Sequence, residues 1–265
     1  MSRRFSAALS LACKATLLMA TLVTGSALSG IPGLGARPAW AEPQTAAPVR
    51  IILLAPPGAG KTTQALRLAE LYKVPAISTG QLLRTAAAAD TPEGREIKRL
   101  LDKGDLVSDD TVISLLKTRL KQPDTAGGWV MHGFPRTLLQ ALALDNMLVE
   151  AFQAVQLVVA MQVPGKTLVE RLSHRLVCKV CARTYNEATN PPKAAGICDA
   201  DGGPLIQRPE DQAELAKQRV ADQERLHEEM QAYYSRRDIF LEVDGTGDIA
   251  GVQGEITREL RKRRR

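Results

Sequence analysis

The sequence has few aromatic residues, which make up 4% of its 265 residues, whereas 45% of the residues are apolar. This apolar content is enough for the core of one ordinary globular domain with insertions, and it excludes an intrinsically disordered chain. The sequence has neither the glycine repeat of collagen nor the series of long apolar segments of a multi-span membrane protein. We therefore expect one globular domain.

Acidic residues are absent from the first 41 positions, which hold the four basic residues Arg3, Arg4, Lys14 and Arg37. Removing these four charges from the formal net charge of +6 leaves only +2. A residual charge this small gives no reason to expect a nucleic acid partner. The basic run at 261–265 is interpreted as a solvated helix end, and no partner is assigned to it.

The first 41 residues have the pattern of a secretion signal. A positive start is followed by an apolar stretch to about Leu28 and by the Ala-x-Ala cleavage site at 39–41. The pattern predicts a signal peptide over 1–41 and a mature start at Glu42. The uninterrupted part, 15–28, is shorter than the roughly 20 residues that span a bilayer, so no stable membrane insertion is expected after cleavage. We expect export, with the periplasm as destination; the alternative is a mis-annotated start codon and a cytoplasmic protein.

Short apolar runs alternate with amphipathic stretches along the rest of the chain. The runs occupy 49–54, 129–131, 157–163 and 240–243. This alternation is typical of a parallel sheet covered by helices, so we expect a doubly wound α/β core. Between Cys178 and Arg208 the sequence is rich in Pro, Gly, Asn, Asp and Cys, and it is too long for a plain loop. We expect a small inserted subdomain there.

A glycine-rich loop follows the first apolar run. Residues 55–63 read Ala-Pro-Pro-Gly-Ala-Gly-Lys-Thr-Thr, which matches a phosphate-binding P-loop except for Ala55 in place of the first glycine. Gly58 and Gly60 allow backbone N–H groups to converge on phosphate oxygens, and Lys61 adds a mobile charge. Thr62 or Thr63 can reach a magnesium ion. The loop therefore predicts a nucleoside triphosphate site.

Further motifs narrow this prediction. Residues 77–84, 104–109, 133–137, 169–175, 191–193 and 207–211, with Arg219, resemble the successive signatures of the adenylate kinase family and occur in the same order. The resemblance covers about 49–260. It implies a P-loop core with a five-stranded parallel sheet covered by helices, a helical AMP-binding insertion and a small zinc-stapled lid. The implied boundaries are kinase 42–265, core 48–77, 108–170 and 213–260, AMP-binding region 78–107 and lid 171–212.

The resemblance also implies the reaction Mg·ATP + AMP ⇌ 2 ADP, in a monomer whose partners are ATP, AMP and ADP. Because phosphoryl transfer places negative charge on several oxygens, cations are expected to carry catalysis. The catalytic group implied is Lys61, Arg136, Arg171, Arg175, Arg208 and Arg219. The ATP-binding group implied is Gly58, Ala59, Gly60, Lys61, Thr62, Thr63, Arg171, Arg175, Thr184, Tyr185 and Gly247. The AMP-binding group implied is Thr79, Arg84, Asp105, Leu106, Val107, Gly133, Phe134, Pro135, Arg136, Gln140, Arg208 and Arg219.

The segment between 178 and 208 carries a metal-ligand pattern. Cys178 and Cys181 form one knuckle, and Cys198 and Asp201 form a second one sixteen residues later, as a tetrahedral structural Zn²⁺ requires. A disulfide is the alternative, because an exported protein reaches an oxidising environment. However, three thiols remain once Cys13 is removed with the signal, and an odd number cannot pair completely. Zinc is the preferred interpretation, with a structural role.

Two positions depart from the family pattern. His132 and Gln81 stand where the family has aspartates that support magnesium and its waters. Their replacement removes two negative charges that would face the ion, which predicts weaker metal positioning and lower turnover. Thr62 partly compensates as a hydroxyl ligand. The alternatives are therefore another nucleoside monophosphate kinase, or a weakly active nucleotide-binding protein.

Overall fold

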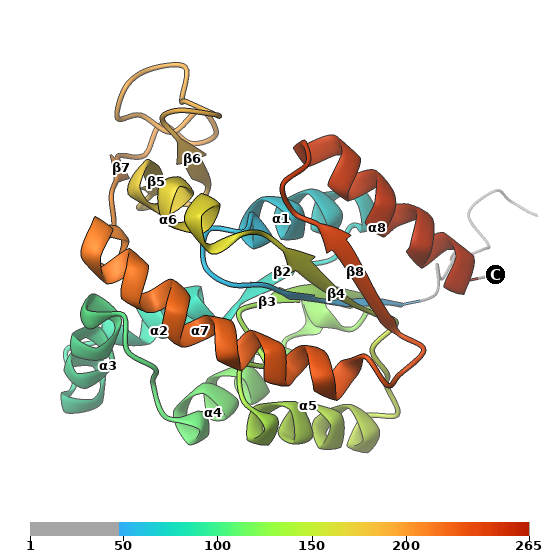
Figure 1. The fold of residues 1–265 in the computed structure, drawn as a ribbon. Coiled ribbons are helices and arrows are strands. Elements are labelled where there is room, and N and C mark those ends of the chain that lie inside the picture. Colours follow the sequence, from blue (N-terminus) through green and yellow to red (C-terminus); the bar gives the residue numbers. More distant parts are fainter. Residues whose placement is uncertain (1–47, 265) are drawn as a thin grey trace, which may run out of the picture. The chain divides into compact units, whose positions relative to one another are not determined.

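A computed structural model describes residues 48–264, and the predicted signal peptide lies outside the described residues. Figure 1 shows the order of the elements. The strands are β1 (Val49–Leu54), β2 (Ala76–Ser78), β3 (Gly128–His132), β4 (Leu157–Gln162), β5 (Arg175–Cys178), β6 (Thr184–Asn186), β7 (Leu205–Ile206) and β8 (Phe240–Asp244). The helices are α1 (Lys61–Tyr72), α2 (Thr79–Ala87), α3 (Pro92–Lys103), α4 (Asp109–Leu120), α5 (Leu138–Glu150), α6 (Gly165–Ser173), α7 (Ala213–Tyr234) and α8 (Ile249–Arg263). Two short 3₁₀ turns are η1 (Pro123–Thr125) and η2 (Pro209–Asp211).

Five strands form one parallel sheet in the order β2-β3-β1-β4-β8. All six residues of β1 are buried, Arg50 included, which explains why five of them are apolar and do not alternate with polar residues. The predicted α/β fold with a five-stranded parallel sheet is confirmed. Because parallel strands end at the same edge, the residues that follow β1, β2 and β3 meet there.

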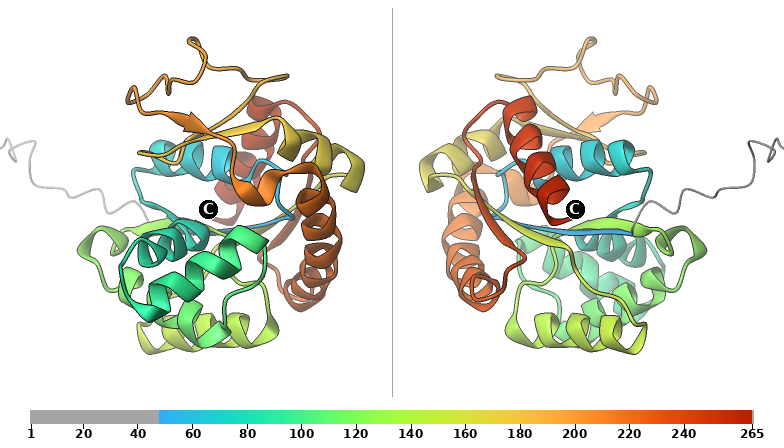
Figure 2. Two further views of the ribbon diagram at one scale, coloured as in Figure 1. Left: turned by 90° about the vertical axis from the view of Figure 1, so that its left-hand side faces the viewer. Right: turned by 90° about the vertical axis from the view of Figure 1, so that its right-hand side faces the viewer.

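Helices cover both faces of this sheet. Alternate residues of β1 belong to different core clusters, so that Ile51 and Leu53 pack with α1 and α8, whereas Ile52 and Leu54 pack on the opposite side. The second side holds α2, α3, α4, α5 and the end of α7. Figures 1 and 2 show α1 and α8 on one side of the sheet and α2 to α5 on the other. The sequence also predicts one helical face formed by Ala65, Leu68, Ala69 and Tyr72; in α1 the first three are buried and Tyr72 is partly buried against the same cluster.

The segment implied to bind AMP consists of two consecutive helices. The hydroxyl of Ser78 accepts a hydrogen bond from the Gln81 N–H and caps α2, and Thr91 caps α3 in the same way. Gly104 ends α3 in the left-handed conformation that glycine adopts without strain. These caps satisfy backbone groups that would otherwise lack partners, so a short insertion can hold two stable helices.

The inserted segment after α6 contains a small antiparallel sheet in the order β6-β5-β7. Its core is formed only by Cys178, Tyr185 and Cys198, with Leu176 and Leu205 packed against them. The sequence predicted a subdomain here but not its strands. Across residues 48–264, no helix is both long enough and apolar enough to cross a bilayer.

Candidate active site

The P-loop connects the end of β1 to the start of α1. Gly58 has φ +86°, and a Cβ added there would lie 2.9 Å from the carbonyl oxygen of Leu168, so only glycine fits. Ala55 is not among the residues with positive φ, so the missing first glycine of the motif causes no backbone strain. Among the described residues, no side chain caps α1. Its first N–H groups, together with the positive end of the helix, are therefore available to an anion.

Lys61 lies at the first position of α1. Its Nζ donates to the carbonyl oxygens of Ala55 and Pro56, each at 2.6 Å. Burial lowers the pKa of Lys61 well below its ordinary value, and Arg136, Arg175 and Arg219 lower it further. An anion beside Lys61 would raise this pKa again, because it would compensate both the burial and the repulsion by the arginines. The geometry thus favours a phosphate ligand at this position.

Arginines line one cleft of about 1020 Å³ together with the P-loop. The arginines that the sequence singled out all line it: Arg84, Arg136, Arg171, Arg175, Arg208 and Arg219. Burial, followed by the neighbouring arginines, lowers the pKa of Arg136 to about 10 and that of Arg208 to about 9. Crowded cations in a partly buried cleft are stabilised by a polyphosphate, which supplies the opposite charge.

Two buried acids hold part of this cationic group in place. Asp211 is fully buried and accepts a bidentate pair from Arg175, with Nε–Oδ2 at 2.8 Å and Nη2–Oδ1 at 2.6 Å. The same carboxylate accepts from Arg219 at 3.2 Å, and Glu210 lies 3.8 Å from Arg84. Because planar guanidinium groups match carboxylates and phosphates equally well, these acids orient the arginines for a phosphate ligand.

On the side of α2 and α3, most of the residues implied to bind AMP line the cleft: Thr79, Arg84, Asp105, Leu106, Val107, Gly133, Arg136, Gln140, Arg208 and Arg219. Gly133 has φ +81°, and a Cβ there would lie 2.7 Å from Thr79 Oγ1, so the segments that carry these two residues pack closely. Phe134 and Pro135 do not line this cleft. Phe134 is fully buried in the core, because the strand end carries it beneath the loop rather than into it.

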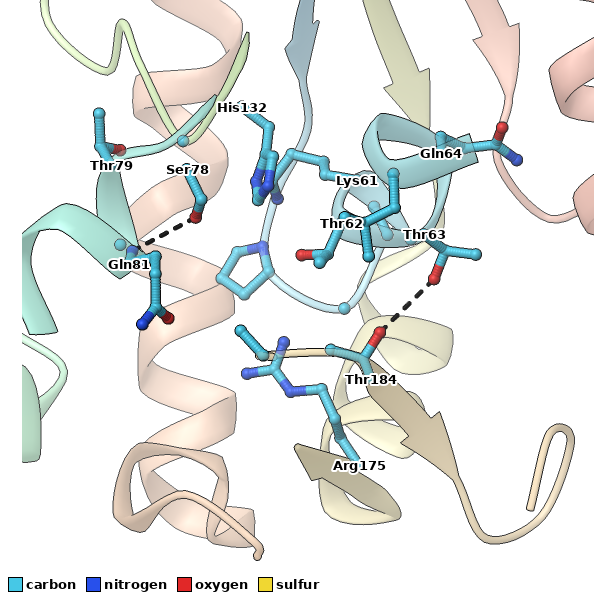
Figure 3. A pocket seen from close by; sticks show the side chains of 18 of the residues that line it. Lys61, Thr62, Thr63, Gln64, Ser78, Thr79, Gln81, His132, Arg175 and Thr184 are labelled. Atoms are coloured by element: carbon cyan, nitrogen blue, oxygen red, sulfur yellow. Dashed lines mark hydrogen bonds between the residues drawn. The ribbon is translucent and has the colours of Figure 1, made fainter. Parts of the chain in front are cut away.

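On the opposite side, every residue implied to bind ATP lines the same cleft: Gly58 to Thr63, Arg171, Arg175, Thr184, Tyr185 and Gly247. Thr63 Oγ1 lies 3.5 Å from Thr184 Oγ1, which brings the P-loop helix and the lid strand β6 together (Figure 3). Arg171 donates to the carbonyl oxygen of Gly245 at 3.1 Å. The cleft therefore spans both implied nucleotide sites.

The four residues of the predicted metal site gather in the lid. Their ligand atoms all lie within 4.8 Å of one another. Cys178 Sγ lies 3.3 Å from Asp201 Oδ1, and Cys181 Sγ lies 3.7 Å from Cys198 Sγ. Zinc–sulfur bonds of about 2.3 Å in a tetrahedron place two sulfurs about 3.8 Å apart, so the residues fit zinc. The three described cysteines are free thiols.

Comparison with known proteins agrees with this geometry. The family model for adenylate kinase matches residues 53–239. The chain belongs to the adenylate kinase family. An adenylate kinase of Archaeoglobus fulgidus is 44% identical over 214 residues, which is 81% of this chain and 99% of the relative. An adenylate kinase of Thermodesulfovibrio yellowstonii is 43% identical over 81% of this chain and 100% of the relative, and one of Brevibacillus brevis is 41% identical over 80% and 100%.

Sequence reasoning missed three residues that hold side chains of the cleft in place. Asp211, described above, stood inside a quoted motif without a role. Gln223 accepts from Arg136 Nη1 at 3.1 Å, and its position four residues after Arg219 on α7 was the available signal. Asp109 accepts from Gln140 Nε2 at 2.6 Å and orients that amide. The link to Gln140 is long in sequence, so no local pattern predicts it.

Proposed function

We propose that the protein catalyses reversible transfer of the γ-phosphoryl group from Mg·ATP to AMP, giving two ADP, and so serves nucleotide homeostasis. The observation that carries this proposal is that Lys61 and six arginines from distant parts of the chain line one cleft with the P-loop. Two nucleotides with their phosphates meeting end to end need this arrangement. If the same cations lay on separate faces of the molecule, they would form only surface ion pairs.

The chain's own residues supply charge and position. An AMP phosphate oxygen attacks the γ-phosphorus while the bond to the oxygen that bridges it to the β-phosphorus breaks, so no covalent enzyme intermediate is needed. Lys61 and the P-loop N–H groups bind the donor phosphates, and Arg84 and Arg136 bind the acceptor phosphate. Arg175 and Arg219 lie near enough to Lys61 to lower its pKa, which supports a shared role at the transferred group.

Magnesium, when bound with ATP, neutralises phosphate charge. Thr62 follows Lys61, and Figure 3 shows the Thr62 side chain within the cleft. Its hydroxyl group is therefore suited to hold the ion. Among the described cleft-lining residues the carboxylates are Asp105, Glu210 and Asp248. Asp248 caps α8 and Glu210 faces Arg84, so the donors fit an ion carried mainly by the nucleotide.

An assay of ADP formation tests the activity. Lys61→Ala is the control, because Lys61 is the mobile cation of the P-loop. We expect the natural chain to exceed this variant by at least about 100-fold. Equal rates would favour the weakly active nucleotide-binding alternative. In that case His132→Asp with Gln81→Asp should raise turnover if missing carboxylates are the cause.

Acceptor choice separates this proposal from another nucleoside monophosphate kinase. Gln140 is buried, and its amide is oriented by Asp109 and by the backbone N–H of Arg136. A fixed, buried amide discriminates strongly between bases, since the wrong base leaves polar atoms unpaired. We expect AMP to be preferred over CMP, UMP and GMP. A higher kcat/KM for any of these three would contradict the proposal.

For the lid we propose a structural Zn²⁺ held by Cys178, Cys181, Cys198 and Asp201. Four protein ligands leave no open position, so the ion would hold a subdomain with a very small core in one conformation. Metal analysis of the purified protein should find one zinc per chain. Removal by a chelator should lower the unfolding temperature, whereas disulfide-bonded protein would bind no zinc and would lose two thiols in a titration.

We also propose export to the periplasm as a monomer. The support is the basic start, the apolar stretch and the Ala-x-Ala site of the first 41 residues. Cell fractionation and sequencing of the mature N-terminus should find a chain that begins at Glu42. A cytoplasmic chain that retains Met1, or begins near Pro48, would contradict export. Size-exclusion chromatography tests the monomer.

A further inference from the structure

His132 lies at the carboxyl end of the sheet, on the strand next to the central strand β1. It ends β3 and pairs in register with Leu53 of β1 on one side and with Ser78 of β2 on the other. The P-loop leaves β1 two residues after Leu53, so the imidazole stands beside the P-loop. Figure 3 shows the labelled His132, Lys61 and Thr62 side chains around the same space. His132 also lines the cleft.

The imidazole is nearly enclosed and lacks a protein partner. His132 is 7% exposed, and among residues 48–264 its ring nitrogens form no hydrogen bond. The ring nitrogens are not among the described side-chain atoms that are fully buried without a partner, so they remain accessible from the cleft. An unpaired donor that lines a ligand cleft is therefore expected to find its partner in the ligand.

The charges around His132 decide what that ligand is. Burial, followed by Lys61, Arg136, Arg84 and Arg208, lowers the pKa of His132 to about 3, so the ring is neutral. A neutral imidazole offers one N–H donor, which suits a phosphate oxygen. The cleft lining holds nine Lys and Arg residues against three carboxylates. Such a surface attracts a polyphosphate strongly. It offers few carboxylate oxygens to a Mg²⁺ ion.

We propose that His132 is a phosphate-binding residue, donating an imidazole N–H to the nucleotide polyphosphate, and that the cleft consequently binds metal-free nucleotide about as tightly as its magnesium complex. This inference rests on the proposed function, since it concerns the same cleft. A carboxylate at this position would do the opposite, because it would repel phosphate and favour the metal complex.

Isothermal titration calorimetry with ATP alone tests this, in magnesium-free buffer and with saturating Mg²⁺, on zinc-loaded protein. We expect the two Kd values of the natural chain to agree within about threefold. His132→Asp should weaken metal-free binding by at least about tenfold while changing Mg·ATP binding much less. His132→Asn, which keeps a neutral donor, should retain metal-free binding.

His174→Asp is the matched control, because it makes the same change in charge at an exposed histidine outside the cleft. It should leave both Kd values unchanged. Tenfold or greater magnesium dependence in the natural chain, or identical behaviour of His132→Asp and the natural chain, would overturn the inference. The protein has three histidines, so ¹⁵N NMR can follow the ring directly. Metal-free ATP should shift the His132 ring signal, and an unshifted signal would exclude the contact.

The outcomes also separate this inference from the proposed function. Binding only as the magnesium complex, together with ADP formation, would reject the role of His132 and leave the kinase intact. Failure to bind ATP in both buffers would reject the kinase and this inference together.

Discussion

At the level of single residues, Gly133 shows how little space separates it from Thr79 at the proposed acceptor site. Gly133→Ala would place a methyl group 2.7 Å from Thr79 Oγ1 and would hold alanine at φ +81°. We expect a loss of about 1 to 3 kcal/mol in the free energy of unfolding and a raised KM for AMP. Urea unfolding and initial rates at varied AMP concentration measure the two effects.

Gly196→Ala separates the contact from the strain. Gly196 also has a positive φ, +74°, but a Cβ there meets nothing within 4 Å. The Gly196→Ala variant should lower the free energy of unfolding by about 1 kcal/mol and leave the KM for AMP unchanged. An unchanged KM in both variants would show that the packing of Gly133 on Thr79 does not shape the acceptor site.

Asp211 is the buried anion on which two arginines depend. Asp211→Asn keeps the shape but removes the charge, which leaves Arg175 and Arg219 without their shared partner. We expect a loss of about 3 kcal/mol or more in the free energy of unfolding. Asp124→Asn is the control, because Asp124 forms an equally bidentate pair with Arg119 but is 53% exposed. Its loss should stay below about 1 kcal/mol. Similar losses of unfolding free energy in the two variants would show that burial does not set the contribution of Asp211.

Residues with local signals were predictable, and those with distant partners were not. The P-loop could be predicted because glycines, lysine and helix follow one another directly. The lack of strain at Ala55 could not, since φ depends on how the loop meets α6. The role of Asp211 depends on η2 meeting β5 and α7, and that of Asp109 on α4 meeting α5, because their partners lie up to 36 residues away in sequence.

Among the elements, the long buried strands were easier to predict than the short ones. The runs at 157–163 and 240–243 correspond within one residue at each end to β4 and β8. The three-residue β2 and the lid strands β5, β6 and β7 lack enough length for a hydrophobic period. Their pairing depends on tertiary contacts and, in the segment after α6, on the cluster of Cys178, Cys181, Cys198 and Asp201.

The lid provides a prediction about metal affinity. Asp201→Ala removes one of four ligands and should lower zinc affinity at least about 10-fold, whereas Asp201→Cys should retain the metal. Competition with a chromogenic chelator measures both. Asp199→Ala changes a neighbouring aspartate, which accepts from the Lys193 N–H outside the ligand group, and should leave affinity unchanged. Equal zinc binding by Asp201→Ala and the natural chain would exclude Asp201 as a ligand.

For the whole molecule, two histidines make stability depend on pH. Burial is the main cause that lowers the pKa of His132 to about 3 and that of His227 to about 4, from an ordinary 6.5. Both groups therefore stabilise the fold fully above pH 6.5. Below it the unfolded chain takes up protons that the folded chain refuses, and stability falls by up to about 1.4 kcal/mol per pH unit for each histidine.

Urea unfolding at pH 7 and pH 5 checks this dependence. Replacement of both residues by asparagine should flatten the fall in stability between the two values, and His174→Asn, at an exposed position, should not. The titratable groups of the lid contribute equally to the pH dependence of stability in all three proteins. A difference in slope between them therefore comes from the two buried imidazole rings. Parallel curves for the double variant and the natural chain would contradict the assignment.

The double engagement of Asp211 changes what nucleotide binding has to accomplish. Arg175 and Arg219 are already drawn out of water and aligned by a carboxylate, so an arriving phosphate exchanges one anion for another instead of stripping hydration from both guanidinium groups. Part of the cleft's positive field is also cancelled at short range. Affinity for ATP should therefore weaken less with rising ionic strength than the number of arginines suggests, and Asp211→Asn should make that dependence steeper.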